Sequence, residues 1–393
     1  MYEKKSSVKI DEFPVLHSMV ISKMPRVKAL PDGRFLLISN DEKQFNFSFF
    51  DKTKPEGSFS VDYSYGRLVS VTPFNGDLWL EFHYVTAPYE EEYVIVRANS
   101  SHIDAVASFP RESYSHDLPY HHLFINEGYL FLHLIKHNRL HHYRIVNEAE
   151  EIDVMEGGKW YLCGSYPVCA VGHTLELYDP SLNICNTIEY DYEIDELLYA
   201  NSENPGFIAA TFTDLPQEHT ALFVYHKDSQ TTHMAYIEHA VAGMGVSAGR
   251  VWLNPYGFHI QQDLGGCMVF DRFAWPLYIH MRTKGAGNLI GAYPPPFHRS
   301  EGIYQVADGM TLVAESNRIL VLDYNCRAVQ EISLAHPDCF AVSNDGGNMA
   351  VLDIDRSKYG QEEMFTHTST LTLYQWNGNT GGGKVIEMVN FQR

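Results

Sequence analysis

Short segments in which apolar and polar residues alternate recur along the whole chain, and turn signals separate them. The stretch 302–334 is the clearest example. Asp308-Gly309 and Ser316-Asn317 mark turns within it, and the pattern predicts four strands: Ile303–Ala307, Met310–Ala314, Ile319–Asp323 and Val329–Leu334. A period of two residues, bounded by Gly, Asn and Asp, is typical of antiparallel strands. The sequence contains no segment with a clear helical period.

Variants of this unit recur eight times from residue 26 onward. A Gly-containing turn separates the first two strands in most units, as hairpins favour. A residue that initiates turns follows the third strand: Asp51, Asn147, Asp179, Asp228, Asp271, Asp323 and Asn377. The spacing of about 45 residues is that of a four-stranded propeller blade. Because a lone sheet must stack on neighbours, an all-β propeller of four-stranded antiparallel blades follows.

Eight repeats are counted, and seven blades are the alternative because the fourth repeat, at about 160–190, is short. The pattern resembles WD40-like and YVTN-like β-propellers over about residues 26–390, although regular Trp-Asp endings and Gly-His starts are missing. The resemblance implies an architecture and no particular activity. We therefore expect residues 26–393 to form one propeller domain, with KVIEMV as the last strand. Residues 1–25 form an extension whose single strand, Pro14–Ser22, could pair with the last blade and close the ring.

The two ends of such blades differ in the length of their connections. First-to-second and third-to-fourth turns share one end, which we call the tight-turn rim. The other end, the long-loop rim, carries the second-to-third loops and the connections between blades. Its longest segments are Tyr84–Glu92, Pro110–Tyr120, Asp214–His219, Pro255–Gly266, Arg282–Glu301 and Asp355–Ser369. Long loops on a rigid scaffold are where binding concentrates, so we predict a working face there. The alternative is that these loops tolerate insertions without a role.

Composition narrows the classes of partner. The chain has 29 Lys and Arg against 49 Asp and Glu, which gives a formal charge of −20. This charge argues against nucleic acid and anionic membranes as partners and is compatible with a basic protein surface. The six cysteines lack CxxC spacing, and the sequence shows neither a secretory signal nor a membrane-spanning apolar run. We therefore expect a soluble, cytoplasmic protein.

Aromatic and acidic residues near the predicted long loops are the candidate binding residues: Tyr256, Asp263, Trp275, Tyr293, Phe297, His298, Glu90 and Asp117. Tyr293 and Phe297 flank three prolines, which hold the longest connection extended. Aromatic residues are enriched at interaction hot spots. They are also common in propeller cores, so a structural role is the alternative.

Histidines suggest a metal site at the same face. His116, His121 and His122 lie close together in the sequence, and imidazoles that converge on a channel can bind a divalent metal. Their spacing matches no known ligand set, so solvated surface histidines are the alternative. The Gly245–Gly249 stretch fits a GxSxG pattern but lies between two predicted strands rather than before a helix, so no catalytic residue is assigned.

Two function hypotheses follow. The first is a non-enzymatic binding module without a cofactor, which presents an acidic, aromatic long-loop face to a protein partner with a basic surface. One form of it is a cytosolic neutraliser of a toxin or effector. The second is a metal-dependent lyase or hydrolase that acts on a small polar or sugar-like substrate at the channel mouth through histidines. A scaffold without a dedicated site is a third possibility.

Overall fold

The computed structural model describes most of the chain, and the statements below concern these residues: 2–15, 27–40, 44–51, 54–87, 90–111, 120–163, 165–190, 196–201, 206–212, 219–226, 228–237, 240–247, 250–257, 262–263, 266–281, 302–305, 310–315, 318–323, 327–334, 340–343, 346–354 and 365–377. They are almost entirely strands, with one 3-10 turn at Tyr63–Tyr65. Within these ranges no helix is long and apolar enough to cross a membrane.

The described strands form eight antiparallel sheets, which we call blades one to eight in chain order. Blades one to four are built as follows: β2 (Val27–Ala29), β3 (Phe35–Asn40), β4 (Gln44–Asp51) and β5 (Lys54–Asp62); β6 (Arg67–Phe74), β7 (Asp77–Ala87), β8 (Glu90–Ala98) and β9 (Ile103–Arg111); β10 (His121–Asn126), β11 (Tyr129–Lys136), β12 (Arg139–Ile145) and β13 (Ala149–Met155); β14 (Lys159–Cys163), β15 (Tyr166–Val171), β16 (Thr174–Tyr178) and β17 (Ile184–Glu189).

Blades five to eight continue this order: β18 (Glu196–Asn201), β19 (Gly206–Phe212), β20 (His219–His226) and β21 (Thr231–Ile237); β22 (Ala240–Ser247), β23 (Arg250–Gly257), β25 (Gly266–Phe270) and β26 (Pro276–Met281), with the short β24 (Gln262–Asp263); β27 (Gly302–Gln305), β28 (Thr311–Ala314), β29 (Arg318–Leu322) and β30 (Ala328–Ser333); β31 (Phe340–Val342), β32 (Asn348–Ile354), β33 (Phe365–Trp376) and β1 (Tyr2–Val15).

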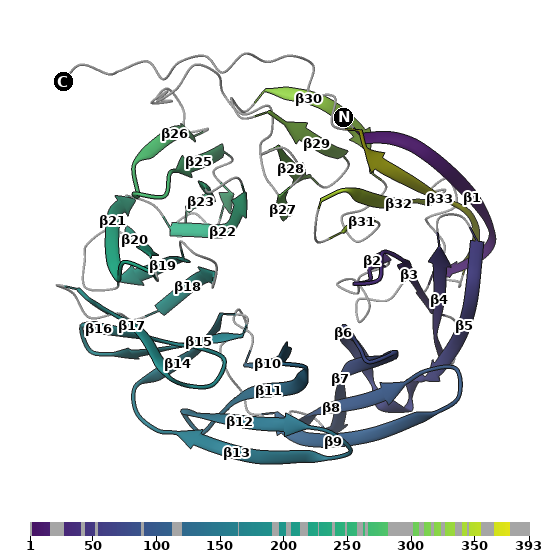
Figure 1. Cartoon of the computed structure of the whole chain (residues 1–393), viewed down its shortest axis with the longest axis horizontal. Helices are drawn as coiled ribbons and strands as arrows, with labels where there is room; N and C mark the ends of the chain where they lie inside the picture. The colour runs from purple at the N-terminus through teal and green to yellow at the C-terminus, as the bar shows by residue number, and fades with distance from the viewer. Residues whose placement is uncertain are drawn as a thin grey trace.

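The sheets stand around a common axis, with the first strand of each sheet near the axis and the last at the perimeter (Figure 1). Sheets arranged in this way pack face against face, and each buries the apolar surface of its neighbours. The chain is a β-propeller. This confirms the predicted fold class and its four-stranded antiparallel blades.

In blades one to three the tight-turn rim is built as the sequence predicts, whereas Asp308, Gly309 and Asp345 of the later predicted turns lie outside the described residues. Gly33, Asn75, Gly76 and Gly128 adopt positive φ in turns between first and second strands. Glycine and Asn tolerate this conformation with little strain, which explains their positions. The second-to-third connection of blade two differs from its prediction, because Tyr84–Glu92 is mostly an extension of the β7–β8 hairpin, in which Ala87 pairs with Glu90.

The predicted aspartates close the turns between third and fourth strands. Asp179 Oδ1 accepts hydrogen bonds from the backbone N–H groups of Ser181 at 2.8 Å and Asn183 at 2.9 Å. Asp271 accepts two equivalent bonds in the turn of blade six, and Asp323 accepts one, from the Arg327 N–H, in the turn of blade seven. The carboxylate therefore fixes backbone donors in each of these turns, which explains why the residue recurs.

Replacing Asp179 with Ala is expected to lower the free energy of unfolding by about 1 to 2 kcal/mol, because two backbone donors lose a charged acceptor. Asp179→Asn keeps an acceptor oxygen at the same place and should lose clearly less. Urea denaturation of both variants at constant pH measures the difference. Equal losses for the two variants would contradict this role of the acceptor.

The N-terminal strand completes the last blade. β1 pairs antiparallel with β33 from Tyr2↔Trp376 to Val15↔Phe365, and the two lie side by side at the perimeter (Figure 1). The strand predicted at Pro14–Ser22 therefore lies mostly earlier in the chain, and its last seven residues lie outside the described residues. The KVIEMV segment also lies outside them, and β1 occupies the fourth position of blade eight that KVIEMV was expected to fill.

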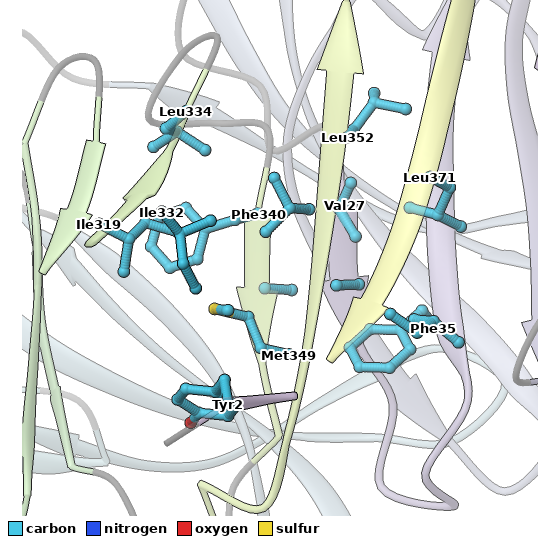
Figure 2. Packing of buried hydrophobic residues seen from close by; sticks show 14 of the residues in the cluster. Tyr2, Val27, Phe35, Ile319, Ile332, Leu334, Phe340, Met349, Leu352 and Leu371 are labelled. Atoms are coloured by element: carbon cyan, nitrogen blue, oxygen red, sulfur yellow. The ribbon is translucent and has the colours of Figure 1, made fainter. Parts of the chain in front are cut away.

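A continuous apolar core joins blades seven, eight and one across this closure. Ile319 and Ile332 of blade seven, Met349 of blade eight and Phe35 of blade one are buried in one cluster with Tyr2. Figure 2 shows these side chains between the translucent strands. The closing strand therefore contributes to packing as well as to strand pairing.

The outermost strands share one irregularity. In seven of the described sheets this strand has one residue more than its partner near the tight-turn rim, a β-bulge at Lys5, Glu56, Val106, Ile152, Cys185, Leu277 or Val329. Bulges twist an edge and make it a poor template for another strand. β21 of blade five differs, because it pairs with β20 over seven consecutive residues without a register shift.

Candidate functional site

The structure describes only part of the predicted binding set. Tyr256 on β23 and Asp263 on β24 are register partners in the second-to-third connection of blade six, at the long-loop rim. Glu90 is the first residue of β8 at the same rim. Four residues of the set lie outside the described part of the chain: Asp117, Tyr293, Phe297 and His298. The predicted metal ligand His116 also lies outside it.

Trp275 lies at the opposite rim from the one where the sequence analysis placed it. It ends the turn between β25 and β26, the third and fourth strands of blade six, and therefore belongs to the tight-turn rim. The residue is 66% exposed, the highest value among the large apolar residues in the described part of the chain. Proximity in sequence to Tyr256 was misleading here, because an intervening strand carries the chain from one rim to the other.

The turn that carries Trp275 is tightly held. Asp271 Oδ1 accepts hydrogen bonds from the N–H groups of Phe273 at 2.8 Å and Trp275 at 2.9 Å, and the Asp271 N–H donates to the Trp275 carbonyl at 2.9 Å. Ala274 is buried at a positive φ of 58°. Trp275 is therefore an exposed side chain on a rigid backbone. We call residues 271–275 the aromatic turn.

The aromatic turn also contacts blade five. His226 on β20 shares a hydrogen bond of 2.8 Å with the Arg272 carbonyl. The Phe273 ring meets the imidazoles of His226 and His233 at centroid distances of 6.0 and 5.4 Å. The Arg272 guanidinium lies 4.9 Å from the centre of the Phe273 ring. These contacts fix the turn against the third and fourth strands of the neighbouring blade.

His121 and His122 do not converge. Successive residues of a strand point to opposite faces of its sheet. His121 approaches Glu81 of blade two, with His121 Nε2 at 3.5 Å from Glu81 Oε2. His122 lies on the other face, where its ring stacks on Phe124 at 5.9 Å. The predicted pair of ligands is therefore split between two faces of β10.

Around His121 lies a buried polar cluster of Glu81, Tyr93, His83, Tyr120 and His121, which we call the Glu81 cluster. The Tyr93 hydroxyl donates to Glu81 Oε2 at 2.8 Å, and the Tyr120 hydroxyl shares a hydrogen bond of 3.0 Å with His83 Nε2. The rings of Tyr93 and His121 have centroids only 3.8 Å apart. This close packing joins blades two and three through polar groups.

Burial dominates the electrostatics of this cluster. It raises the pKa of Glu81, although hydrogen bonds from Tyr93 and Ser70 and the charge of Lys28 act in the opposite direction. It also raises the pKa of Tyr93 well above the ordinary value. The Lys28 ammonium donates a hydrogen bond to the Val71 carbonyl, and burial lowers the pKa of Lys28. The cluster therefore holds a carboxyl that binds its proton more readily than an exposed Glu.

His122 belongs to a row of three imidazoles across blade three. His122 pairs in register with His133, and His133 pairs with His142. His133 Nε2 and His142 Nδ1 share a hydrogen bond of 2.8 Å, and His133 is fully buried. Burial and the neighbouring His142 and His122 lower the pKa of His133 to about 3. His133 is therefore neutral at ordinary pH.

The described residues do not contain a group of three or more His, Cys, Asp or Glu arranged to hold a metal ion. In the row, His133 and His142 bond to each other, and the His122 ring stacks on Phe124. A divalent metal at the long-loop rim stays a prediction, since His116 lies outside the described residues.

No family model matches the chain. A comparison with curated proteins also gives no match. Among solved structures, the chain is similar to the WD40 domain of coronin from Toxoplasma gondii, with 12% identity, 91% and 90% of the two chains covered and a TM-score of 0.43. It is also similar to the Pan2 WD40 domain from Neurospora crassa, with 13% identity, 96% and 98% coverage and a TM-score of 0.40.

Sequence reasoning missed the Glu81 cluster, although a signal for it is present. Residues 77–83 read DLWLEFH, in which Asp77, Trp79, Glu81 and His83 share one face of β7. The other face, with Leu78, Leu80 and Phe82, packs in the core between blades one and two. This alternation identifies an apolar face and a face with polar and aromatic residues. The second face is buried only where a neighbouring blade covers it, and in β7 blade three does so.

Proposed function

We propose that the protein is a non-enzymatic binding module whose aromatic turn contacts a protein partner. The observation that carries this proposal is Trp275, an exposed Trp on a turn held by Asp271. Trp is among the residues most enriched at binding hot spots. A rigid backbone lowers the entropy lost when such a side chain is immobilised, so the turn is preorganised for binding.

The formal charge of −20 supports a partner with a basic surface. Opposite charges accelerate the encounter of two proteins and favour correct partners over acidic ones. The proposed surface is the tight-turn rim at blades five and six. It keeps the aromatic character expected from the sequence and differs in the rim that carries it.

The test uses the intact protein immobilised on a support, in parallel with Trp275→Ser and with Tyr129→Ser as a matched control. Tyr129 is also exposed at the tight-turn rim, but on blade three. Proteins retained from a lysate by the wild type and the control, and lost by Trp275→Ser, are purified and their affinities measured. Loss of a hot-spot Trp should weaken binding by about tenfold or more.

A second measurement examines the charge of the partner. Affinity should fall as ionic strength rises toward about 0.15 M, because salt screens attraction between exposed charges. The proposal fails if a purified partner binds Trp275→Ser as tightly as the wild type. If the affinity does not depend on salt, the part of the proposal that gives the partner a basic surface is wrong.

A further inference from the structure

β21 offers an outer edge unlike the other outermost strands of the described sheets. Within the described residues it pairs only with β20, and the pairing runs without interruption from Thr220↔Ile237 to His226↔Thr231. The outermost strands of the other seven sheets each carry a bulge. An unbroken edge is a better template for a new strand, because its outward N–H and C=O groups keep a regular spacing.

The residues of β21 also lack the charges that protect an edge. Its sequence is TTHMAYI, with Thr231, Thr232, Met234 and Tyr236 exposed. The bulged β13 of blade three reads AEEIDVM and exposes three acidic residues. Charged side chains on an edge disfavour the pairing of a further strand. Thr, Tyr and Ile instead favour extended conformation. β26 also contains no Lys, Arg, Asp or Glu, but it begins with Pro276 and has its bulge at Leu277.

Neighbouring blades hold β21 in place. The Tyr236 hydroxyl shares a hydrogen bond with the Tyr190 hydroxyl of blade four. His233 meets the Phe273 ring of the aromatic turn at 5.4 Å, and Ile237 is buried. Contacts on both faces therefore hold β21 in place. Because β21 is already ordered, it loses little conformational entropy when a partner strand pairs with it.

We propose that β21 accepts an extended segment of a protein partner as a fifth strand of blade five. This inference rests on the proposed function and names its mode of recognition, β-strand addition, in which main-chain hydrogen bonds supply affinity. Met234 and Tyr236, exposed by 48% and 46% on one face of β21, provide apolar contacts for the side chains of the added strand. The aromatic turn lies beside the same strand and extends the surface.

Charge selects the occupant. Two copies of this chain, each with a formal charge of −20, repel one another at low ionic strength. A partner segment with Lys or Arg on either side of an uncharged, strand-forming stretch avoids this repulsion. The uncharged stretch matches β21, and the net negative charge of the chain attracts the basic flanks. The occupant is therefore a basic, strand-forming segment of another protein rather than a second copy.

The experiment uses the full chain and a synthetic peptide of about nine residues, the length of an ordinary strand, with alternating Thr and Val between pairs of Lys. Two further peptides carry N-methyl groups on one or the other set of alternate backbone amides. Methylation removes donors without changing charge, and only one of the two sets faces β21. Binding is followed by fluorescence anisotropy, and protection of β21 amides by hydrogen exchange.

Two protein variants complete the design. Met234→Asp places a charge on the β21 edge, and Ile152→Asp places the same charge at the bulge of β13, where the native side chain is similarly exposed. A new acidic residue attracts the Lys-flanked peptide at a distance, so weaker binding to Met234→Asp cannot come from repulsion between the protein and the peptide. We expect Met234→Asp to weaken binding by about tenfold, because the added strand would cover the new carboxylate and lose the apolar contact with Met234. Ile152→Asp should bind at least as tightly as the wild type.

The inference holds if one methylated peptide loses binding, the other keeps it, and exchange slows at β21. It is overturned if both methylated peptides bind equally, if Ile152→Asp loses as much affinity as Met234→Asp, or if another outer strand is protected. It is also overturned if sedimentation shows that the wild type alone forms dimers which Met234→Asp dissociates. The peptide titration needs no natural partner, so its failure is distinguishable from that of the Trp275 test.

Discussion

Replacing Tyr2 with Ala is expected to lower the free energy of unfolding by about 4 kcal/mol, a loss typical of a buried aromatic side chain cut back to Ala. Tyr2 is 3% exposed, its ring meets Trp376 edge-on at 5.2 Å, and its hydroxyl donates to the Gly346 carbonyl at 2.7 Å. Its backbone N–H and C=O both bond to the Gln330 side chain. One residue therefore ties β1 to blades seven and eight (Figure 2).

Tyr2→Phe is the matched control, because it keeps the ring and removes only the hydrogen bond to Gly346. It should lose about 1 kcal/mol. Urea denaturation followed by Trp fluorescence and by far-ultraviolet circular dichroism compares the three proteins. A loss below about 1 kcal/mol for Tyr2→Ala would show that closure of the ring does not depend on this side chain.

Acid is expected to destabilise the protein through His133. Its pKa is about 3 in the folded chain against an ordinary 6.5. Because the folded-state value is the lower one, the unfolded chain binds the proton more readily. The stabilisation is complete above about pH 6.5 and is lost as the pH falls toward 3. Between about pH 7 and pH 5 this one residue accounts for a loss of about 2 kcal/mol.

His133→Phe should remove most of that loss, because Phe does not titrate and fits beside Phe124, whose ring lies 4.6 Å from that of His133. Phe131→Leu, on the same face of β11, is the control. It should lower stability equally at both pH values, because it removes no titratable group. Urea denaturation at the two pH values measures the difference. If His133→Phe were as sensitive to acid as the wild type, other groups would be responsible.

Local patterns predict the blades well because each blade is a local structure. The stretch 302–334 gives β27 to β30 within a few residues of their predicted positions. Even the short fourth repeat forms a complete sheet, β14 to β17. The alternation of apolar residues and the turn residues Gly and Asp act over distances of a few residues, so a sequence pattern contains them.

Features that depend on residues far apart in the chain are harder to predict from the sequence. β1 reads YEKKSSVKIDEFPV, and its several charged residues conceal a strand at a solvent-facing edge. Its partner lies more than 300 residues away in the chain. His121 and His122 are adjacent in sequence, which suggests a shared site, whereas the pleat of β10 places them on opposite faces. The position of Trp275 could have been inferred, since Asp271 marks a third-to-fourth turn and hence the tight-turn rim.

The closure of blade eight also has a consequence during synthesis. Of the described strands, a ribosome makes β1 first and β33 last, so β1 must wait until all the others have been made before its partner emerges. Blades one to seven can each form from contiguous residues as they leave the exit tunnel, whereas the ring can close only after translation of β33. Until then the apolar cluster around Tyr2 stays open, and the newly made protein is most exposed to chaperones and proteases in this interval.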